Sequence, residues 1–320
     1  MNNLNQLFFK SARLIVCKLS SREINYPSIK YIALKEYASK LIYDILNQEN
    51  PCMIARLGAV EATALCNYIG VKNKTSWVDY IKGQTPPWWW DNSVKYIMSN
   101  NAGFFPTTDE MLNKFGELMM SDISLIDILG SWCPQEILFQ KYWDNTKYID
   151  MVDLNPFFET KPWTRILENK KVLVISPFEK SIKKQYEIID KVFPDGIMPQ
   201  FELKTIKAVQ SIANNRVPFD SWFAALEWME SEIDKIDFDI ALIGCGAYGL
   251  PLAAYVKRIG KKAVHLGGTL QLMFGIRCSR FDNIYEPYPW HNLYNEYWVY
   301  PDLDETPKNI EKVENGCYWK

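Results

Sequence analysis

Residues 239–249 read Asp-Ile-Ala-Leu-Ile-Gly-Cys-Gly-Ala-Tyr-Gly, and this stretch decides the fold class. Its first half is a short apolar run with the length of a buried strand, which Gly244 ends. From Gly244 to Gly249 the spacing is G-x-G-x-x-G, and the helix that it opens contains Pro251. A strand, a tight glycine turn and a helix, in that order, form one unit of an α/β fold.

Three further apolar runs have the length of a buried strand, at residues 52–56, 171–176 and 262–266. Helical spacing follows the first run over residues 60–68 and follows the second run after Pro177. Short apolar runs that alternate with helices predict a mostly parallel, doubly wound (Rossmann-like) sheet with helices on both faces.

The first 50 residues are predicted to be a helical segment, with helical spacing over residues 29–46, and residues 51–320 to form the α/β domain. No Gly/Ser-rich linker divides the chain. The best candidate seam is residues 157–163, bordered by prolines, although one large domain fits nearly as well.

The aromatic residues are concentrated in two regions without clear periodicity. Residues 77–90 are predicted to be an insertion over the core, and the tail after Tyr285 to wrap the surface. Aromatic side chains can stack on sugars or bases, but core filling is the better interpretation for most of them. Trp132, in a turn-rich setting, is the stronger candidate for a ligand contact.

The bulk composition excludes several classes of protein. Lys and Arg total 36 against 38 Asp and Glu, so no overall positive field favours nucleic acid. The 7 cysteines include no C-x-x-C pair, which argues against a disulfide framework and indicates a reducing compartment. We therefore expect a cytoplasmic protein.

Residues 1–20 fit neither a secretory signal nor a spanning helix. Their leucines and phenylalanines, beside Lys10, Arg13 and Lys18, are compatible with a basic amphipathic helix. Two interpretations stay open: a helix packed on its own domain, and peripheral contact with the inner face of the membrane.

The glycine turn at residues 244–249 has two interpretations. Glycines at a helix start let main-chain N–H groups approach a phosphate, and they can equally serve only to pack helix against strand. A dinucleotide site would need an acidic residue about 20 residues later. His265 and its neighbours stand there instead, which disfavours nicotinamide and flavin cofactors.

A second turn, Gly267-Gly268, follows the run at residues 262–266, and Gln271, Arg277 and Arg280 come soon after it. Arg277 is the candidate for bidentate contact with a phosphate. The alternative is a solvated or ion-paired arginine.

Residues 56–61, Arg-Leu-Gly-Ala-Val-Glu, place an arginine at the end of a strand and a carboxylate at the start of a helix. Ligands of open α/β sheets bind at the carboxyl ends of the strands. Glu61 is therefore a candidate general base or metal ligand, with capping of its helix as the alternative. Ser176 and Ser181 follow another strand, and the sequence favours a helix cap as the use of Ser176, with Pro177 at the first helical position.

Residues 56–61 also resemble the R-F-G-D-G-E segment of bacterial glycosyltransferases with the GT-D fold. Residues 243–268 resemble that family's C-terminal strand, glycine turn, helix and short strand ending in a His/Gly segment. The two matches bracket most of residues 50–280. Ala59 stands where the family has a metal-binding aspartate, so one ligand is missing and Glu61 would act alone or as a base.

The resemblance implies a nucleotide-sugar donor, a divalent metal (Mn or Mg), and a glycan or glycolipid acceptor in bacterial surface polysaccharide or glycoprotein synthesis. Glu61 is the expected catalytic residue and tentative metal ligand. The residues expected to bind the nucleotide sugar are Arg56, Gly58, Ser176, Ser181, Gly244, Gly246, Tyr248, Gly249, His265, Gly267, Gly268, Gln271 and Arg277. The alternatives are a Rossmann-type oxidoreductase and a non-catalytic glycan-binding module.

Overall fold

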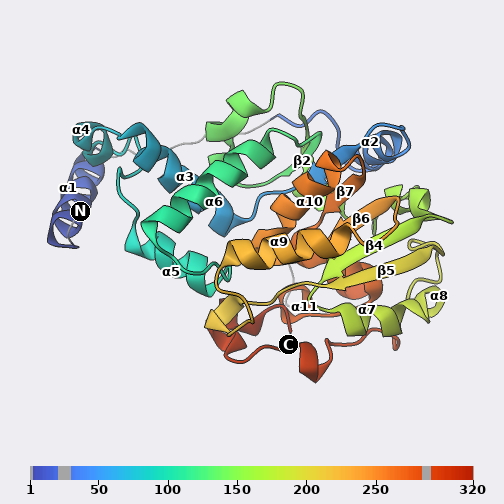
Figure 1. Cartoon of the computed structure of the whole chain (residues 1–320). Coiled ribbons are helices and arrows are strands. Elements are labelled where there is room, and N and C mark those ends of the chain that lie inside the picture. The colour runs from blue at the N-terminus through green and yellow to red at the C-terminus, as the bar shows by residue number, and fades with distance from the viewer. Residues whose placement is uncertain (1–2, 21–29, 283–289, 320) are drawn as a thin grey trace.

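The computed structural model describes residues 3–20, 30–282 and 290–319, and a seven-stranded sheet runs through its centre (Figure 1). The strand order is β3-β2-β1-β7-β6-β4-β5, and every neighbouring pair is parallel. The strands are β1 (Cys52–Ala55), β2 (Ile128–Ser131), β3 (Lys147–Asp150), β4 (Lys171–Ser176), β5 (Glu202–Lys207), β6 (Ile240–Ile243) and β7 (Lys262–His265). The predicted fold class is confirmed, and the sheet is parallel throughout.

Successive residues of the central strands pack into two different cores. In β4, Leu173 and Ile175 belong to one core, and Val172 and Val174 belong to the other. A strand that is covered on both faces needs an apolar residue at nearly every position. This is why the central strands appear in the sequence as unbroken apolar runs.

Helices cover both faces of the sheet. The α10 face carries α3 (Ala59–Asn73), α5 (Asn92–Asn100), α6 (Asp109–Ile123), α9 (Trp222–Ile233) and α10 (Gly249–Arg258). The α7 face carries α2 (Glu36–Leu46), α7 (Glu179–Tyr186), α8 (Ile189–Val192) and the 3-10 segments η3 (Trp163–Leu167) and η6 (Gly267–Phe274). The shorter helices α4 (Trp77–Ile81) and α11 (Ser279–Asp282), and the longer α1 (Asn3–Ser20), complete the set.

The order of the strands determines where two neighbouring strands lead into helices on opposite faces of the sheet. β4 leads to β5 over the α7 face, whereas its neighbour β6 leads to β7 over the α10 face. β1 and β7 diverge in the same way, into α3 and η6 respectively. Ligands of open α/β sheets bind outside the carboxyl ends of such diverging strands.

Three regions differ in detail from the sequence-based expectation. The helix expected over residues 29–46 begins only at Glu36, because Ile32 N–H donates to Tyr148 O (2.9 Å) and Ala33 pairs with Ile149 beside β3. Strands from both sides of residues 157–163 belong to the same sheet. The described part of the tail is irregular, as expected, but it also fills a core with Trp290, Trp298 and Trp319.

Candidate functional site

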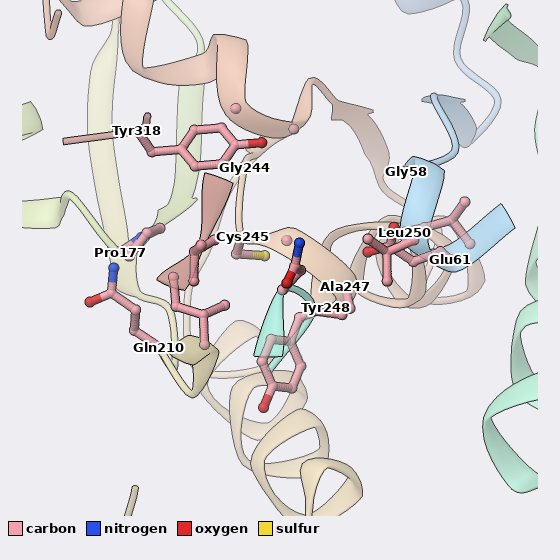
Figure 2. A pocket seen from close by; sticks show the side chains of 18 of the residues that line it. Gly58, Glu61, Pro177, Gln210, Gly244, Cys245, Ala247, Tyr248, Leu250 and Tyr318 are labelled. Atoms are coloured by element: carbon pink, nitrogen blue, oxygen red, sulfur yellow. The ribbon is translucent and has the colours of Figure 1, made fainter. Parts of the chain in front are cut away.

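A cavity of about 190 Å³ lies at the carboxyl ends of β1, β2, β4, β6 and β7 (Figure 2). Most of the residues expected to bind a ligand line it: Arg56, Gly58, Glu61, Ser176, Gly244, Gly246, Tyr248, His265, Gly267, Gly268 and Gln271. Trp132 lines it too. Segments that are far apart in the sequence therefore meet where the diverging strands open the sheet.

Arg56 contributes a partly buried positive charge to the cavity wall. Its guanidinium lies over the Trp132 ring, 4.8 Å from the centroid, and the Trp132 indole N–H donates to Leu57 O at 2.7 Å. Burial lowers the pKa of Arg56, whereas Glu61 favours its charged form. An arginine stays protonated at neutral pH even when its pKa is lowered, so the wall is cationic.

Arg280, in α11, brings a second guanidinium to the cavity. It bonds to the Tyr318 hydroxyl, and its guanidinium carbon lies 5.0 Å from the centroid of that ring. Burial is the main cause of the lowered pKa of Arg56, and the positive charge of Arg280 lowers it further. The cavity therefore holds two like charges in proximity, an arrangement suited to an anionic ligand.

Arg277 does not line the cavity. Its guanidinium lies between the rings of Tyr294 (4.7 Å) and Tyr300 (5.0 Å) and 3.4 Å from an Asp282 oxygen. The alternative interpretation, an ion-paired arginine, is the one that the structure supports. The sequence does not indicate which of Arg277 and Arg280 reaches the cavity. Tyr318, which bonds to Arg280, comes from a distant part of the chain.

Glu61 lies at the start of α3 and is the only carboxylate among the described residues that line the cavity. Its side chain folds back over Gly58, where an added Cβ would come within 1.9 Å of the Glu61 Oε2 atom. This is the position of a glutamate that caps the first turn of its own helix. Glu61 thus faces the cavity and can stabilise α3 at the same time.

The glycine turn at residues 244–248 forms the floor of the cavity before α10 begins. Gly246 has φ of +58°, a conformation that favours glycine. At Gly249 a Cβ would lie 2.2 Å from the His265 ring, so this glycine serves helix-to-strand packing and not the cavity. The spacing of the motif follows from the fold itself, and the residues that point to a ligand are those of the cavity as a whole.

Two other residues expected to bind the ligand, His265 and Tyr248, line the cavity. Burial lowers the pKa of His265 to about 4, so the ring is neutral near pH 7, and Nδ1 donates to Ile243 O at 3.2 Å. The remaining nitrogen, Nε2, is then a hydrogen-bond acceptor. Tyr248 stacks on Trp222 with centroids 4.8 Å apart, and its hydroxyl lies 3.1 Å from the Ser211 hydroxyl.

Two glutamines that line the cavity have side-chain atoms without a hydrogen-bond partner among the described residues. These atoms are the Oε1 of Gln271 and the Nε2 of Gln210. Buried polar atoms are nearly always hydrogen-bonded, so each is a candidate contact for a ligand. Gln210 is not suggested by the sequence, because it follows an edge strand with no clear pattern.

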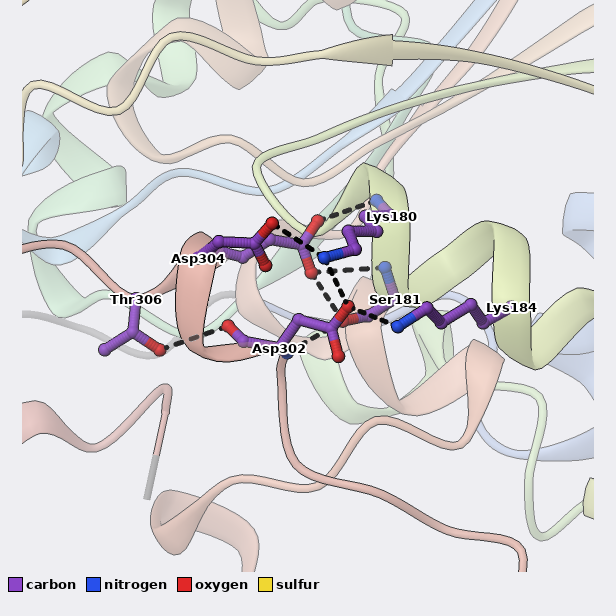
Figure 3. A network of polar contacts seen from close by, with 7 residues as sticks. Lys180, Ser181, Lys184, Asp302, Asp304 and Thr306 are labelled. Atoms are coloured by element: carbon purple, nitrogen blue, oxygen red, sulfur yellow. Dashed lines mark hydrogen bonds and ion pairs between the residues drawn. The ribbon is translucent and has the colours of Figure 1, made fainter.

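The serines expected at the end of β4 serve local structure. The Ser176 hydroxyl accepts the Phe178 N–H at 3.2 Å in the turn before α7, whose N-cap residue is Phe178. Ser181 does not line the cavity and bonds to the Glu305 carboxylate, which also accepts the Lys180 N–H at 2.6 Å (Figure 3). The start of α7 is therefore occupied by the protein's own C-terminal region.

We define the acidic clasp as Asp302, Asp304 and Glu305. Lys180 lies 2.7 Å from Asp304, and Lys184 lies 2.7 Å from Asp302, so the clasp is held along α7 (Figure 3). The residues after the clasp bring Val313, Tyr318 and Trp319 to the cavity. The clasp thus positions one wall of the cavity.

No family model, curated protein or solved structure matches this chain. The features that point to a function are the geometry of the cavity and the sequence resemblance of residues 56–61 and 243–268.

Proposed function

We propose that this protein is a glycosyltransferase that moves a sugar from a nucleoside diphosphate to a glycan or glycolipid acceptor. One observation carries the proposal: Arg56 and Arg280 lie together in a cavity at the carboxyl ends of parallel strands. A diphosphate between them would relieve their mutual repulsion and accept bidentate hydrogen bonds. The start of α10 would add the positive end of a helix dipole.

The resemblance of residues 56–61 to GT-D glycosyltransferases supports a sugar nucleotide over other diphosphates. It also supports a cytoplasmic role in building bacterial surface polysaccharide or glycoprotein. Trp132, which is exposed at the cavity, offers an aromatic face of the kind that stacks on sugars.

In the proposed reaction an acceptor hydroxyl attacks the anomeric carbon of the donor sugar. A bond forms between that carbon and the acceptor oxygen, and the bond from the carbon to the diphosphate oxygen breaks. The nucleoside diphosphate leaves with the electron pair, and the acceptor proton passes to the Glu61 carboxylate. Arg56 and Arg280 would stabilise the charge on the leaving diphosphate.

The residues present do not fit a metal held by protein ligands. The described residues include no group of three or more His, Cys, Asp or Glu side chains that could hold a metal ion. At the cavity Glu61 is the single described carboxylate, and Ala59 has no ligand atom. No step of the proposal therefore passes through a metal.

Calorimetric titration with nucleoside diphosphates, nucleotide sugars, the matching monophosphates and NAD tests the proposal. We expect at least one nucleoside diphosphate to bind with a Kd at least tenfold below that of its monophosphate, because the second phosphate can contact the second guanidinium group. A tenfold change in Kd corresponds to about 1.4 kcal/mol of binding free energy. Replacing manganese by EDTA should leave that Kd unchanged. If no nucleoside diphosphate binds with or without manganese, the proposal is wrong.

The role of Glu61 has a separate test. Glu61→Gln should lower sugar transfer by about 100-fold or more, because the amide cannot accept the acceptor proton. The Kd for the nucleoside diphosphate should change by less than about threefold. Unchanged transfer by the variant would assign Glu61 to helix capping alone.

A further inference from the structure

One face of α1 is fixed to the rest of the protein. Lys10 Nζ lies 2.7 Å from an Asp91 oxygen, and Arg13 donates to Thr85 O at 2.8 Å. The Phe9 ring meets the Trp88 ring edge-on, with centroids 5.0 Å apart. These contacts determine which side of the helix points outward.

The outward side of α1 is apolar. Its large side chains are between 60% and 82% exposed, namely Leu4, Leu7, Phe8, Leu14, Ile15 and Leu19. At 3.6 residues per turn they cover about 140° of the helix surface. Figure 1 shows α1 at the edge of the molecule, beside α4 and away from the sheet. A contiguous apolar patch in such a position indicates an interaction surface.

The width and content of this patch do not suit a second copy of the helix. The seam of a helix pair is narrower and repeats apolar residues at two positions in seven. Here Ser11 and Lys18 fall within the patch, and a helix pair would bury them. At a lipid surface, by contrast, the long Lys18 side chain can extend to the headgroups while the neighbouring leucines enter the acyl region.

The charge of α1 is complementary to anionic lipid. The helix contains no acidic residue, although the whole chain has a net charge of −2, and Lys18 is exposed within the apolar patch. Lys10 is paired with Asp91 and Arg13 with main-chain carbonyls, so Lys18 is the basic residue of α1 that faces outward. Lys82 is exposed and adds a charge beside the C-terminal end of α1, since its neighbour Ile81 accepts from the Cys17 thiol at 3.9 Å. Apolar area and basic charge together determine binding of an amphipathic helix to an anionic bilayer.

We infer that α1 anchors this protein on the surface of an anionic phospholipid bilayer, with its outward apolar face inserted at the boundary between headgroups and acyl chains. None of the helices in the described ranges is long and apolar enough to cross a bilayer. The anchor lies on the membrane surface and does not depend on the proposed transferase activity.

Co-sedimentation of the full chain with vesicles tests the anchor. Vesicles of phosphatidylcholine with phosphatidylglycerol should bind the protein more tightly than vesicles of phosphatidylcholine alone. The double substitution Leu7→Ser and Phe8→Ser should weaken binding at least tenfold. Leu303→Ser is the matched control, because Leu303 is 91% exposed on a different segment, and it should bind as the wild type does. Lys18→Glu should weaken binding to the anionic vesicles only.

Absence of binding to anionic vesicles would overturn the inference, as would equal binding by the double variant. Light scattering provides the other decisive result: if the double substitution converts a dimer into a monomer, the patch is a contact between copies. The double variant should keep the unfolding temperature and the nucleoside diphosphate affinity of the wild type. A failure of the lipid anchor is thereby distinguished from a failure of the proposed function.

Discussion

Arg56 lies over the Trp132 ring, and the main chain at Trp132 is bonded by Glu136, a residue that no sequence pattern identifies. The Trp132 main-chain N–H donates to the Glu136 carboxylate at 3.2 Å, and the Ser131 hydroxyl donates to it at 2.5 Å. Glu136 is fully buried, and this burial raises its pKa to about 7 in spite of these hydrogen bonds and the Arg56 charge. A carboxyl group that titrates near neutral pH therefore supports the wall.

The raised pKa of Glu136 predicts a specific pH dependence of stability. The folded protein retains a proton that the unfolded chain releases, so the stabilisation is complete below about pH 4.5 and is lost as the pH rises to about 7. Glu136→Gln stays neutral throughout. The free energy of unfolding of the variant minus that of the wild type should therefore rise by about 2–3 kcal/mol between about pH 5 and pH 8.

Urea denaturation at both pH values measures this difference. Other titrating groups are shared by the two proteins and cancel. A difference that does not change with pH would mean that Glu136 has an ordinary pKa in the folded state.

At the scale of elements, the start of α7 depends on the tail for its hydrogen bonds. The buried Glu305 carboxylate accepts the main-chain N–H groups of Lys180 (2.6 Å) and Ser181 (3.1 Å). These are N–H groups of the first helical turn, which has no partners within the helix. The negative charge also lies at the positive end of the helix dipole.

Glu305→Ala should therefore lower the free energy of unfolding by about 2–4 kcal/mol, because it removes a buried charged acceptor and leaves its donors unpaired. Asp304→Asn is the control. Asp304 and its partner Lys180 are both exposed, so the free energy of unfolding should fall by much less than it does for Glu305→Ala. Chemical denaturation measures both values, and equal effects would contradict a special role for Glu305.

The central elements of the sheet could be predicted, and the outer ones could not. β1, β4, β6 and β7 are covered on both faces, so each is a continuous apolar run. The edge strand β5 mixes charged and apolar residues, and β3 begins with a lysine and ends with an aspartate. β2 contains Gly130 and Ser131 and has only 4 residues. These strands form because the centre of the sheet provides pairing partners, which local sequence does not record.

In the whole molecule, the residues that line the cavity belong to two groups. Those at the ends of strands could be predicted from the sequence, and those in the C-terminal part could not. Residues at strand ends, such as Arg56 and Gly246, were predicted to lie together, since the carboxyl ends of parallel strands share one edge of the sheet. Tyr318 reaches the same place in the tail that follows the acidic clasp on α7, and it bonds there to Arg280 of α11. No periodicity marks that arrangement, so the sequence alone predicts Arg277 as the phosphate contact.

We propose that Arg280 joins Arg56 in binding a diphosphate, and a comparison of Arg280→Ala with Arg277→Ala distinguishes this arrangement from binding without Arg280. Calorimetry with the nucleoside diphosphate that binds the wild type best is the measurement, and thermal unfolding verifies that both variants are folded. Loss of a charged hydrogen bond at Arg280 should raise the Kd at least tenfold, about 1.4 kcal/mol, whereas Arg277→Ala should raise it less than about threefold. Equal Kd values for the two variants would contradict the account.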